Sequence, residues 1–274
     1  MPVPIGRIEL AGLVVLLAAG PAPVLLQLVS SVGHSWFWPD LAPSAWSWRA
    51  WRYAVSPEAG IPGALFNSLM IAIVVATLAV TVALPAARAL ALYALPGRRW
   101  LHFMLMLPLL APPLALTMGM HVLFLRYGLA DTLTGVVIVH LVPSVPYATM
   151  VLTASLARVD IRLEAQARTL GATPVRVWRH VTLPLIRSGV ATAFGFAFLI
   201  SWSQYLTTLI IGGGQVLTLP LVLVAFQQSG DESVSSVLSL IFLAPAVLIL
   251  TMVGRWMVLP DNERGVGRER DQVS

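Results

Sequence analysis

The chain has 274 residues, of which 58% are hydrophobic and 11% are charged, with a formal net charge of +5. Because ordinary soluble domains carry about 25% charged residues, this composition excludes a soluble domain and predicts an all-α polytopic membrane protein in the lipid bilayer. The absence of cysteine excludes disulfide and thiolate chemistry, the absence of lysine excludes a G-x-x-x-x-G-K-[ST] phosphate loop, and arginines outside the apolar segments indicate no nucleic-acid surface.

Six segments are apolar over about the 20 residues that a membrane-spanning helix needs. In chain order they cover residues 8–32, 65–92, 101–125, 133–156, 187–211 and 234–257. The first apolar run is longer than the 7–15 residues of a signal-peptide core, so we expect it to remain in the protein. Prolines in the third and fourth segments are tolerated where neighbouring helices cover the freed carbonyls. These segments predict a single transmembrane domain over residues 1–274.

The arginines orient the six segments. With the N-terminus inside, three of the 17 basic residues fall outside, namely Arg49, Arg52 and Arg126, and all others fall in cytoplasmic segments. Positive residues concentrate in cytoplasmic loops. Both termini, the loop 157–186 and the charged tail 258–274 are therefore predicted in the cytoplasm.

Two longer segments are then predicted on the outer side. Residues 34–62 contain five tryptophans, which is typical of an interfacial aromatic belt around a short helix. A docking surface for an external protein is the alternative. Residues 212–233 are predicted as the other long outer loop, and the three glycines at its start as a flexible turn that moves with a gate.

Neutral polar side chains recur at helical spacing in the fourth and fifth segments. They are His140, Ser144 and Tyr147 in the fourth, and Ser201, Gln204, Tyr205 and Thr208 in the fifth. Hydrogen bonding between helices is one explanation. A polar lining of a translocation pathway is the other, and we favour it for the fifth segment. No full charge lies deep in a segment, where it would indicate ion or proton coupling.

A charged, helix-forming loop separates the fourth and fifth segments. Residues 164–170 are mostly good helix formers, and Gly171 suits the left-handed turn that often ends a helix. Thr173 and Pro174 are typical of the cap and first position of a new helix. The loop is therefore predicted as two short helices with a glycine break, and a loop lying on anionic headgroups is the alternative.

The second short helix is predicted to be amphipathic and to end at residues 183–184. Val175, Trp178 and Val181 recur at every third residue and should share one face. Trp178 is the largest apolar side chain of that face, and buried aromatic residues dominate interface centres. We expect this face to dock on another protein.

The loop resembles the EAA loop of ABC-importer permeases, the binding-protein-dependent transport inner-membrane components. The family pattern is Glu-Ala-Ala, three residues, Gly, nine residues, an aliphatic residue, any residue, and Leu-Pro. Five positions fit it: Ala167, Gly171, Val181, Leu183 and Pro184. Ala165 and Gln166 depart from it, and Glu164 stands one residue before the expected Glu. The surrounding residues are similar to the spermidine/putrescine branch.

This resemblance implies a MetI-like permease fold with six transmembrane helices in a bacterial inner membrane. It also implies four kinds of partner: a second permease subunit, identical or homologous, two ATP-binding cassette ATPase subunits, an extracytoplasmic solute-binding protein, and lipid. ATP and Mg²⁺ would be bound by the ATPase subunits, and no cofactor by this chain. The residues implied in coupling to the ATPase are Glu164, Ala165, Gln166, Ala167, Arg168, Gly171, Val175, Trp178, Arg179, Val181, Leu183 and Pro184.

The sequence thus favours a non-enzymatic permease subunit that forms half of a solute pathway and switches by alternating access. A secondary transporter or channel without an ATPase is the alternative, which an inverted repeat or a buried acid would favour. His-Glu-x-x-His, Gly-x-Ser-x-Gly and Cys-His groupings are missing, which excludes known hydrolase sets. Residues 201–205 resemble the place where polyamine permeases carry an acidic pair. Ser203 and Gln204 stand there, so we expect a neutral, zwitterionic or weakly charged solute.

Overall fold

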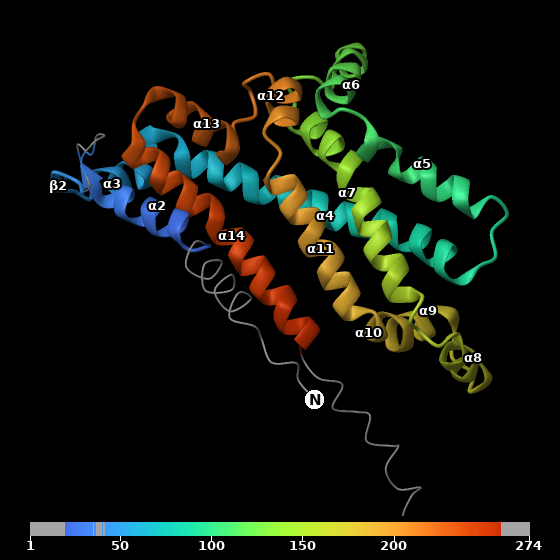
Figure 1. The fold of residues 1–274 in the computed structure, drawn as a ribbon. Coiled ribbons are helices and arrows are strands. Elements are labelled where there is room, and N and C mark those ends of the chain that lie inside the picture. Colours follow the sequence, from blue (N-terminus) through green and yellow to red (C-terminus); the bar gives the residue numbers. More distant parts are fainter. Residues whose placement is uncertain (1–19, 35, 37–39, 41, 259–274) are drawn as a thin grey trace, which may run out of the picture.

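The computed structural model describes residues 20–34, 36, 40 and 42–258, and this part of the chain is mainly helical (Figure 1). The α-helices are α2 (Ala22–Val32), α3 (Arg49–Val55), α4 (Ile61–Leu92), α5 (Arg98–Leu110), α6 (Pro113–Tyr127), α7 (Leu133–Leu156), α8 (Ile161–Thr169), α9 (Pro174–Val177), α10 (Leu183–Leu185), α11 (Arg187–Trp202), α12 (Leu206–Gly212), α13 (Leu219–Ser229) and α14 (Glu232–Val258). A short antiparallel pair joins β1 (Gly33–His34) to β2 (Ala45–Trp46). The helical class predicted from the sequence is confirmed for these residues.

Three helices are each long and apolar enough to cross a membrane, namely α4, α7 and the part of α14 at Glu232–Gly254. Two bent pairs of helices pass the same test when each pair is taken together. Residues 8–19 of the predicted first segment lie outside the described residues, and the described remainder contains α2. That the chain has six spans and that both termini lie in the cytoplasm remain predictions.

The third predicted segment is not one helix. α5 and α6 meet at an angle of 94°, and the break lies at Ala111 and Pro112, whose backbones are extended. The cause is local, because a residue before proline is pushed out of the helical region and proline has no N–H to donate. Pro113 then suits the first position of α6.

The predicted outer loop 212–233 also differs, since it contains the helix α13. Its N-terminal end is held by α4. The backbone N–H of Leu219 donates to Ser68 Oγ over 2.7 Å, and Asn67 Nδ2 donates to the Leu217 carbonyl over 2.9 Å. The turn before α13 is present as expected, with Gly213 at φ 50° and Gly214 at φ 79°.

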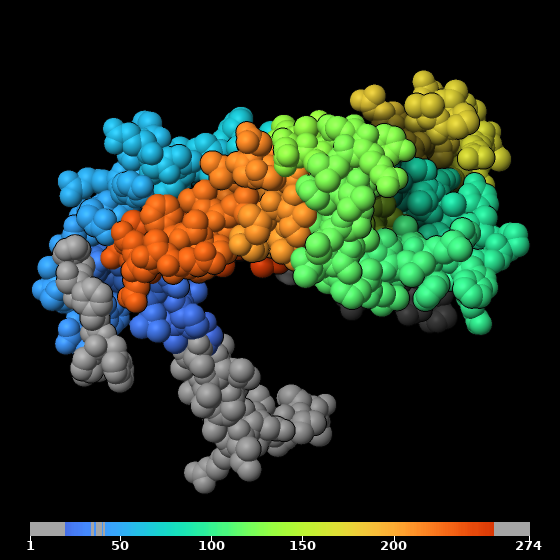
Figure 2. Space-filling view, turned by 90° about the horizontal axis from the view of Figure 1, so that it is seen from above, coloured from blue at the N-terminus to red at the C-terminus, as the bar shows by residue number. Residues whose placement is uncertain are grey.

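The core lies where α7 and α11 pack on α4 (Figure 1). One face of α4 is a seam of alanines that are each 0% exposed: Ala72, Ala76, Ala79, Ala83 and Ala87. Small side chains let membrane helices approach closely. Gly189 of α11 serves the same purpose, because a Cβ there would lie 2.5 Å from Ser155 Cβ of α7. In the view from above, the orange α12–α13 region lies between the blue α2–α3 region and the green α6–α7 region (Figure 2).

Candidate functional site: the loop between α7 and α11

The first half of the loop folds as the sequence predicts. Asp160 caps α8 by accepting a hydrogen bond from the N–H of Arg162 at 2.9 Å. α8 ends before Gly171, which takes the left-handed φ of 86°. Thr173 then caps α9 by accepting from the N–H of Arg176 at 3.4 Å. The loop is thus two short helices with a glycine break.

The second half departs from the prediction. Residues Trp178–Thr182 form a π-helical turn, and the helical path continues through α10 to a bend at Ile186, beyond the expected end at residues 183–184. A π turn holds more residues per turn than an α-helix and rotates the side chains that follow. The two apolar residues before and at the start of this turn differ in exposure: Val175 is 75% exposed, whereas Trp178 is half-buried against the core.

The Glu164 side chain points into the protein, toward Arg88 near the C-terminal end of α4. Arg88 Nη1 donates to its Oε1 over 3.0 Å and Arg88 Nη2 to its Oε2 over 2.6 Å. Thr182 Oγ1 donates to the same Oε1 over 2.7 Å. The guanidinium carbon of Arg88 lies 5.2 Å from the centre of the Trp178 ring, within the range of a cation–π contact. We call these four residues the Arg88–Glu164 latch.

The electrostatics of the latch favour a charged carboxylate. Hydrogen bonds from Arg88 hold the pKa of the Glu164 carboxyl below its ordinary value, and the bond from Thr182 and the Arg88 charge act in the same direction. These effects outweigh burial, which raises that pKa. Since the Glu164 side chain is only 5% exposed, its carboxylate binds to residues of its own chain.

The other predicted coupling residues divide by exposure. Ala167, Trp178 and Val181 are half-buried, and the exposed ones are Ala165, Gln166, Arg168, Gly171, Val175, Arg179, Leu183 and Pro184. Sequence reasoning missed Arg88 and Thr182, and it gave no role to Leu170, which is 88% exposed. A lone arginine at the end of a long apolar helix was the available signal for Arg88.

Four of the predicted pathway residues gather in the interior between α7, α11 and α12. His140 lies between two hydroxyls, with Nδ1 2.9 Å from Ser201 Oγ and Nε2 3.0 Å from Thr208 Oγ1. Ser144 Oγ donates to the His140 carbonyl over 2.8 Å. All four are buried. The break between Trp202 and Leu206, where the sequence predicts a continuous helix, separates Ser201 and Thr208 onto two helices.

Within the described part of the chain, the side chains of the other three make no hydrogen bond to this cluster, although the Gln204 carbonyl accepts from Thr208 Oγ1 over 2.7 Å. Gln204 and Tyr205 are half-buried at the break itself, and Gln204 Oε1 accepts from Thr207 Oγ1 over 2.9 Å. Tyr147 of α7 is 42% exposed. The seven residues therefore form an interior hydrogen-bonded group and an accessible group, rather than one polar stripe.

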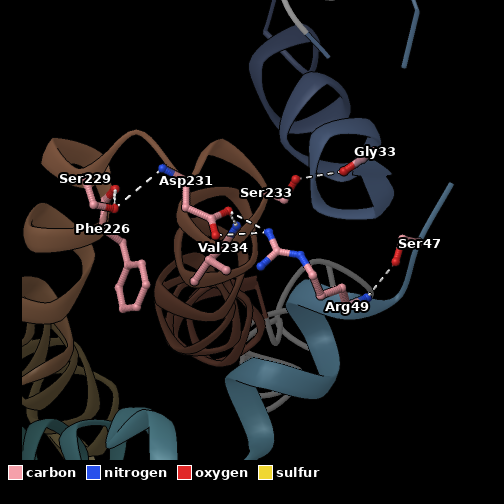
Figure 3. A network of polar contacts seen from close by, with 8 residues as sticks. All are labelled: Gly33, Ser47, Arg49, Phe226, Ser229, Asp231, Ser233 and Val234. Atoms are coloured by element: carbon pink, nitrogen blue, oxygen red, sulfur yellow. Dashed lines mark hydrogen bonds and ion pairs between the residues drawn. The ribbon is translucent and has the colours of Figure 1, made fainter. Parts of the chain in front are cut away.

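A separate polar network joins α3 to the turn between α13 and α14 (Figure 3), near the start of α4 (Figure 1). Arg49 Nη2 donates to both carboxylate oxygens of Asp231, over 3.1 and 3.0 Å. Asp231 Oδ1 also accepts from the N–H of Val234 in the first turn of α14, over 3.1 Å. Ser233 Oγ donates to the Gly33 carbonyl over 2.7 Å. The tryptophan-rich segment is thus fixed to the α13–α14 turn.

Comparison with known families decides the class of protein. Residues 79–259, more than half of the chain, match the family described as "Binding-protein-dependent transport system inner membrane component". The chain belongs to this family. The ABC-importer permease predicted from the loop is confirmed.

Curated relatives of this inner membrane component are permeases too. A putative ABC transporter permease protein, ORF1 of Streptomyces antibioticus, is 30% identical over 72% of this chain and 88% of its own. The putative 2-aminoethylphosphonate transport system permease protein PhnV of Salmonella choleraesuis is 26% identical over 86% and 89%. The spermidine/putrescine transport system permease protein PotC of Haemophilus influenzae is 24% identical over 84% and 90%. These relatives are transport subunits rather than enzymes.

The fold of the inner membrane component is shared with a solved transporter. The crystal structure of a bacterial ABC transporter involved in the import of the acidic polysaccharide alginate matches with a TM-score of 0.66. The match covers 93% of this chain and 99% of that chain at 17% identity. It supports the permease fold.

Proposed function

We propose that this permease is driven through the loop 157–186 by a cytoplasmic ATPase and forms half of a solute pathway. Two ATPase subunits would bind ATP and Mg²⁺, a second permease would complete the pathway, and an external binding protein would deliver solute. Closure of the ATPases would shift the loops, and the spans would change from facing inward to facing outward. The loop and both termini lie in the cytoplasm in this proposal, and the membrane is a bacterial inner membrane.

The exposed apolar side chains on either side of Gly171 carry this proposal. Leu170 is 88% exposed and Val175 is 75% exposed, although water penalises such apolar surface and partner proteins commonly cover it. The loop behind them is held by the Arg88–Glu164 latch. Because the Trp178 ring lies under Arg88, we assign it to supporting the loop from behind, and Leu170 and Val175 to the contact with the ATPase.

Aspartate substitutions test this contact. Leu170→Asp and Val175→Asp should each reduce recovery of the ATPase subunits with an affinity-tagged permease by about tenfold or more, as expected when an interface position loses over 1.4 kcal/mol. Membrane insertion should be unchanged. Tyr127→Asp is the control, because Tyr127 is 72% exposed on α6. Full ATPase recovery with both loop variants would contradict the proposal.

We further propose that Gln204, Tyr205 and Tyr147 face the solute and that the His140 group holds the helices around them. Among the described residues, Asp131 and Asp231 lie at turns and Glu232 is the first residue of α14, so these three acids are not in the middle of an apolar span. The positive charge of a polyamine would therefore stay unpaired inside the apolar spans, which is energetically costly. A neutral or zwitterionic solute fits better. The 2-aminoethylphosphonate named for one relative is of this kind.

Uptake into vesicles tests the solute class. Vesicles with the full complex and its binding protein should not accumulate labelled spermidine at low micromolar concentration in the presence of ATP. ATP-dependent accumulation of spermidine would refute the assignment.

A further inference from the structure

We infer that Arg88 is a positioning residue that makes α4 follow the coupling loop, through the Arg88–Glu164 latch. The inference rests on the proposed function of the loop and adds the route by which a push on it reaches the spans. Arg88 is the single charged residue of the 32-residue helix α4. Its two guanidinium nitrogens bind the two oxygens of one carboxylate of α8, a geometry that fixes orientation as well as distance.

The latch also holds both ends of the π turn. Trp178 is its first residue, and the Arg88 guanidinium lies over its ring. Thr182 is its last residue and donates to the Glu164 carboxylate. π turns occur frequently at functional sites. One ion pair therefore joins three elements: α4, α8 and the π turn.

The chain itself offers no short covalent route from the loop to α4. The loop continues into α7 on one side and α11 on the other, whereas α4 ends at Leu92, far earlier in the sequence. Leu152 and Leu156 of α7 and Ile186, which precedes α11, belong with the α4 alanines to one buried cluster. If a displacement of the loop also moves the end of α4, the three helices α4, α7 and α11 would therefore move together.

Two cysteine reporters separate motion of the loop from motion of α4, since the chain has no native cysteine. Gln166→Cys reports on the loop and Ala86→Cys on α4, and both positions are exposed. The rate of maleimide labelling is measured in the full complex in nanodiscs, without nucleotide and after trapping with ATP and vanadate. In the parent protein both rates should change on trapping.

Removing the latch should uncouple the two reporters. In Arg88→Gln and in Glu164→Gln, the Gln166→Cys response should persist, while the Ala86→Cys response should become at least about twofold smaller. Thr182→Val keeps the ion pair and should reduce the Ala86→Cys response by an intermediate amount. The double variant Arg88→Glu with Glu164→Arg should restore part of the Ala86→Cys response. Arg162→Gln is the control, because Arg162 is an exposed arginine of α8 and should leave both responses unchanged.

The outcomes distinguish the two proposals. An Ala86→Cys response in Arg88→Gln equal to that of the parent, with the complex assembled, overturns the role of the latch and leaves the coupling loop standing. Absence of any Gln166→Cys response in the assembled parent complex overturns the coupling loop and the latch together. Restoration by the charge exchange supports the ion pair as the connection and excludes general damage to the fold.

Discussion

Glu164 stands one residue before the glutamate of the family pattern, and its carboxylate bonds within the chain to Arg88 and Thr182. Spacing in the sequence could not reveal this, because the partner lies 76 residues earlier, on α4. What the sequence did predict was local: the glycine break and the Thr173 cap depend on neighbouring residues only. The inward direction of Glu164 depends on tertiary contacts.

Because the pKa of Glu164 is depressed in the folded protein, the latch should depend on pH in a defined direction. Its stabilising contribution is complete above the ordinary glutamate pKa of about 4.3 and is lost as pH falls through the lower folded-state value. As the pH is lowered below about 4.3, we expect the Tm of the purified permease to fall more steeply than the Tm of Glu164→Gln. Parallel profiles for the two proteins would show that the ion pair contributes no stability.

His140 should matter for stability through both of its ring nitrogens. Hydrogen bonds between membrane helices are worth about 0.6 kcal/mol on average. Thr208→Val should therefore cost about 0.6 kcal/mol, and His140→Leu about twice as much, measured by reversible unfolding in mixed micelles. Thr77→Val is a matched control, since exposed Thr77 donates only to the Ile73 carbonyl of its own helix. A His140→Leu cost no larger than that of Thr77→Val would contradict the bridging role.

At the level of helices, prolines and lengths limited what the sequence could predict. Pro108, Pro112 and Pro113 were visible, but membrane helices also tolerate proline, as α5 does at Pro108, so the prolines alone did not predict the 94° bend. α13 has 11 residues, too few to span a bilayer, so the length criterion for membrane spans does not detect it. The π turn carries no distinctive residue pattern that would have predicted it.

Loss of Asp231 at the start of α14 should cost more than loss of its partner Arg49. Asp231 serves both as a cap and as an ion-pair partner, because it accepts from the N–H of Val234 and from Arg49. Arg49→Gln should cost at most about 1 kcal/mol, since the Arg49 side chain is 49% exposed and water screens the pair. Asp231→Ala loses the cap as well, which adds about 1 kcal/mol. Equal unfolding free energies of the two variants would rule out a capping role.

For the whole molecule, the decisive prediction is orientation. The Arg49–Asp231 network and the Arg88–Glu164 latch lie toward opposite ends of α4, so single cysteines near each should label from opposite sides of the membrane. In intact cells, exposed Glu58→Cys should react with an impermeant maleimide, and Gln166→Cys only after permeabilisation. Labelling of Gln166→Cys in intact cells would reverse the orientation and remove the loop from reach of a cytoplasmic ATPase.

The alanine seam of α4 sets where this permease can deform. Alanine has no side-chain rotamers, so the contacts of Ala72, Ala76, Ala79, Ala83 and Ala87 with the neighbouring helices cannot adapt by changes of χ angle. Shear along the seam would require whole helices to slide, with the buried surfaces moving past one another. Changes of shape should therefore concentrate where helices are interrupted: at Ala111–Pro112, at residues 203–205 and in the π turn. We therefore expect the alanine-lined centre to deform less than these interruptions and the bend at Ile186.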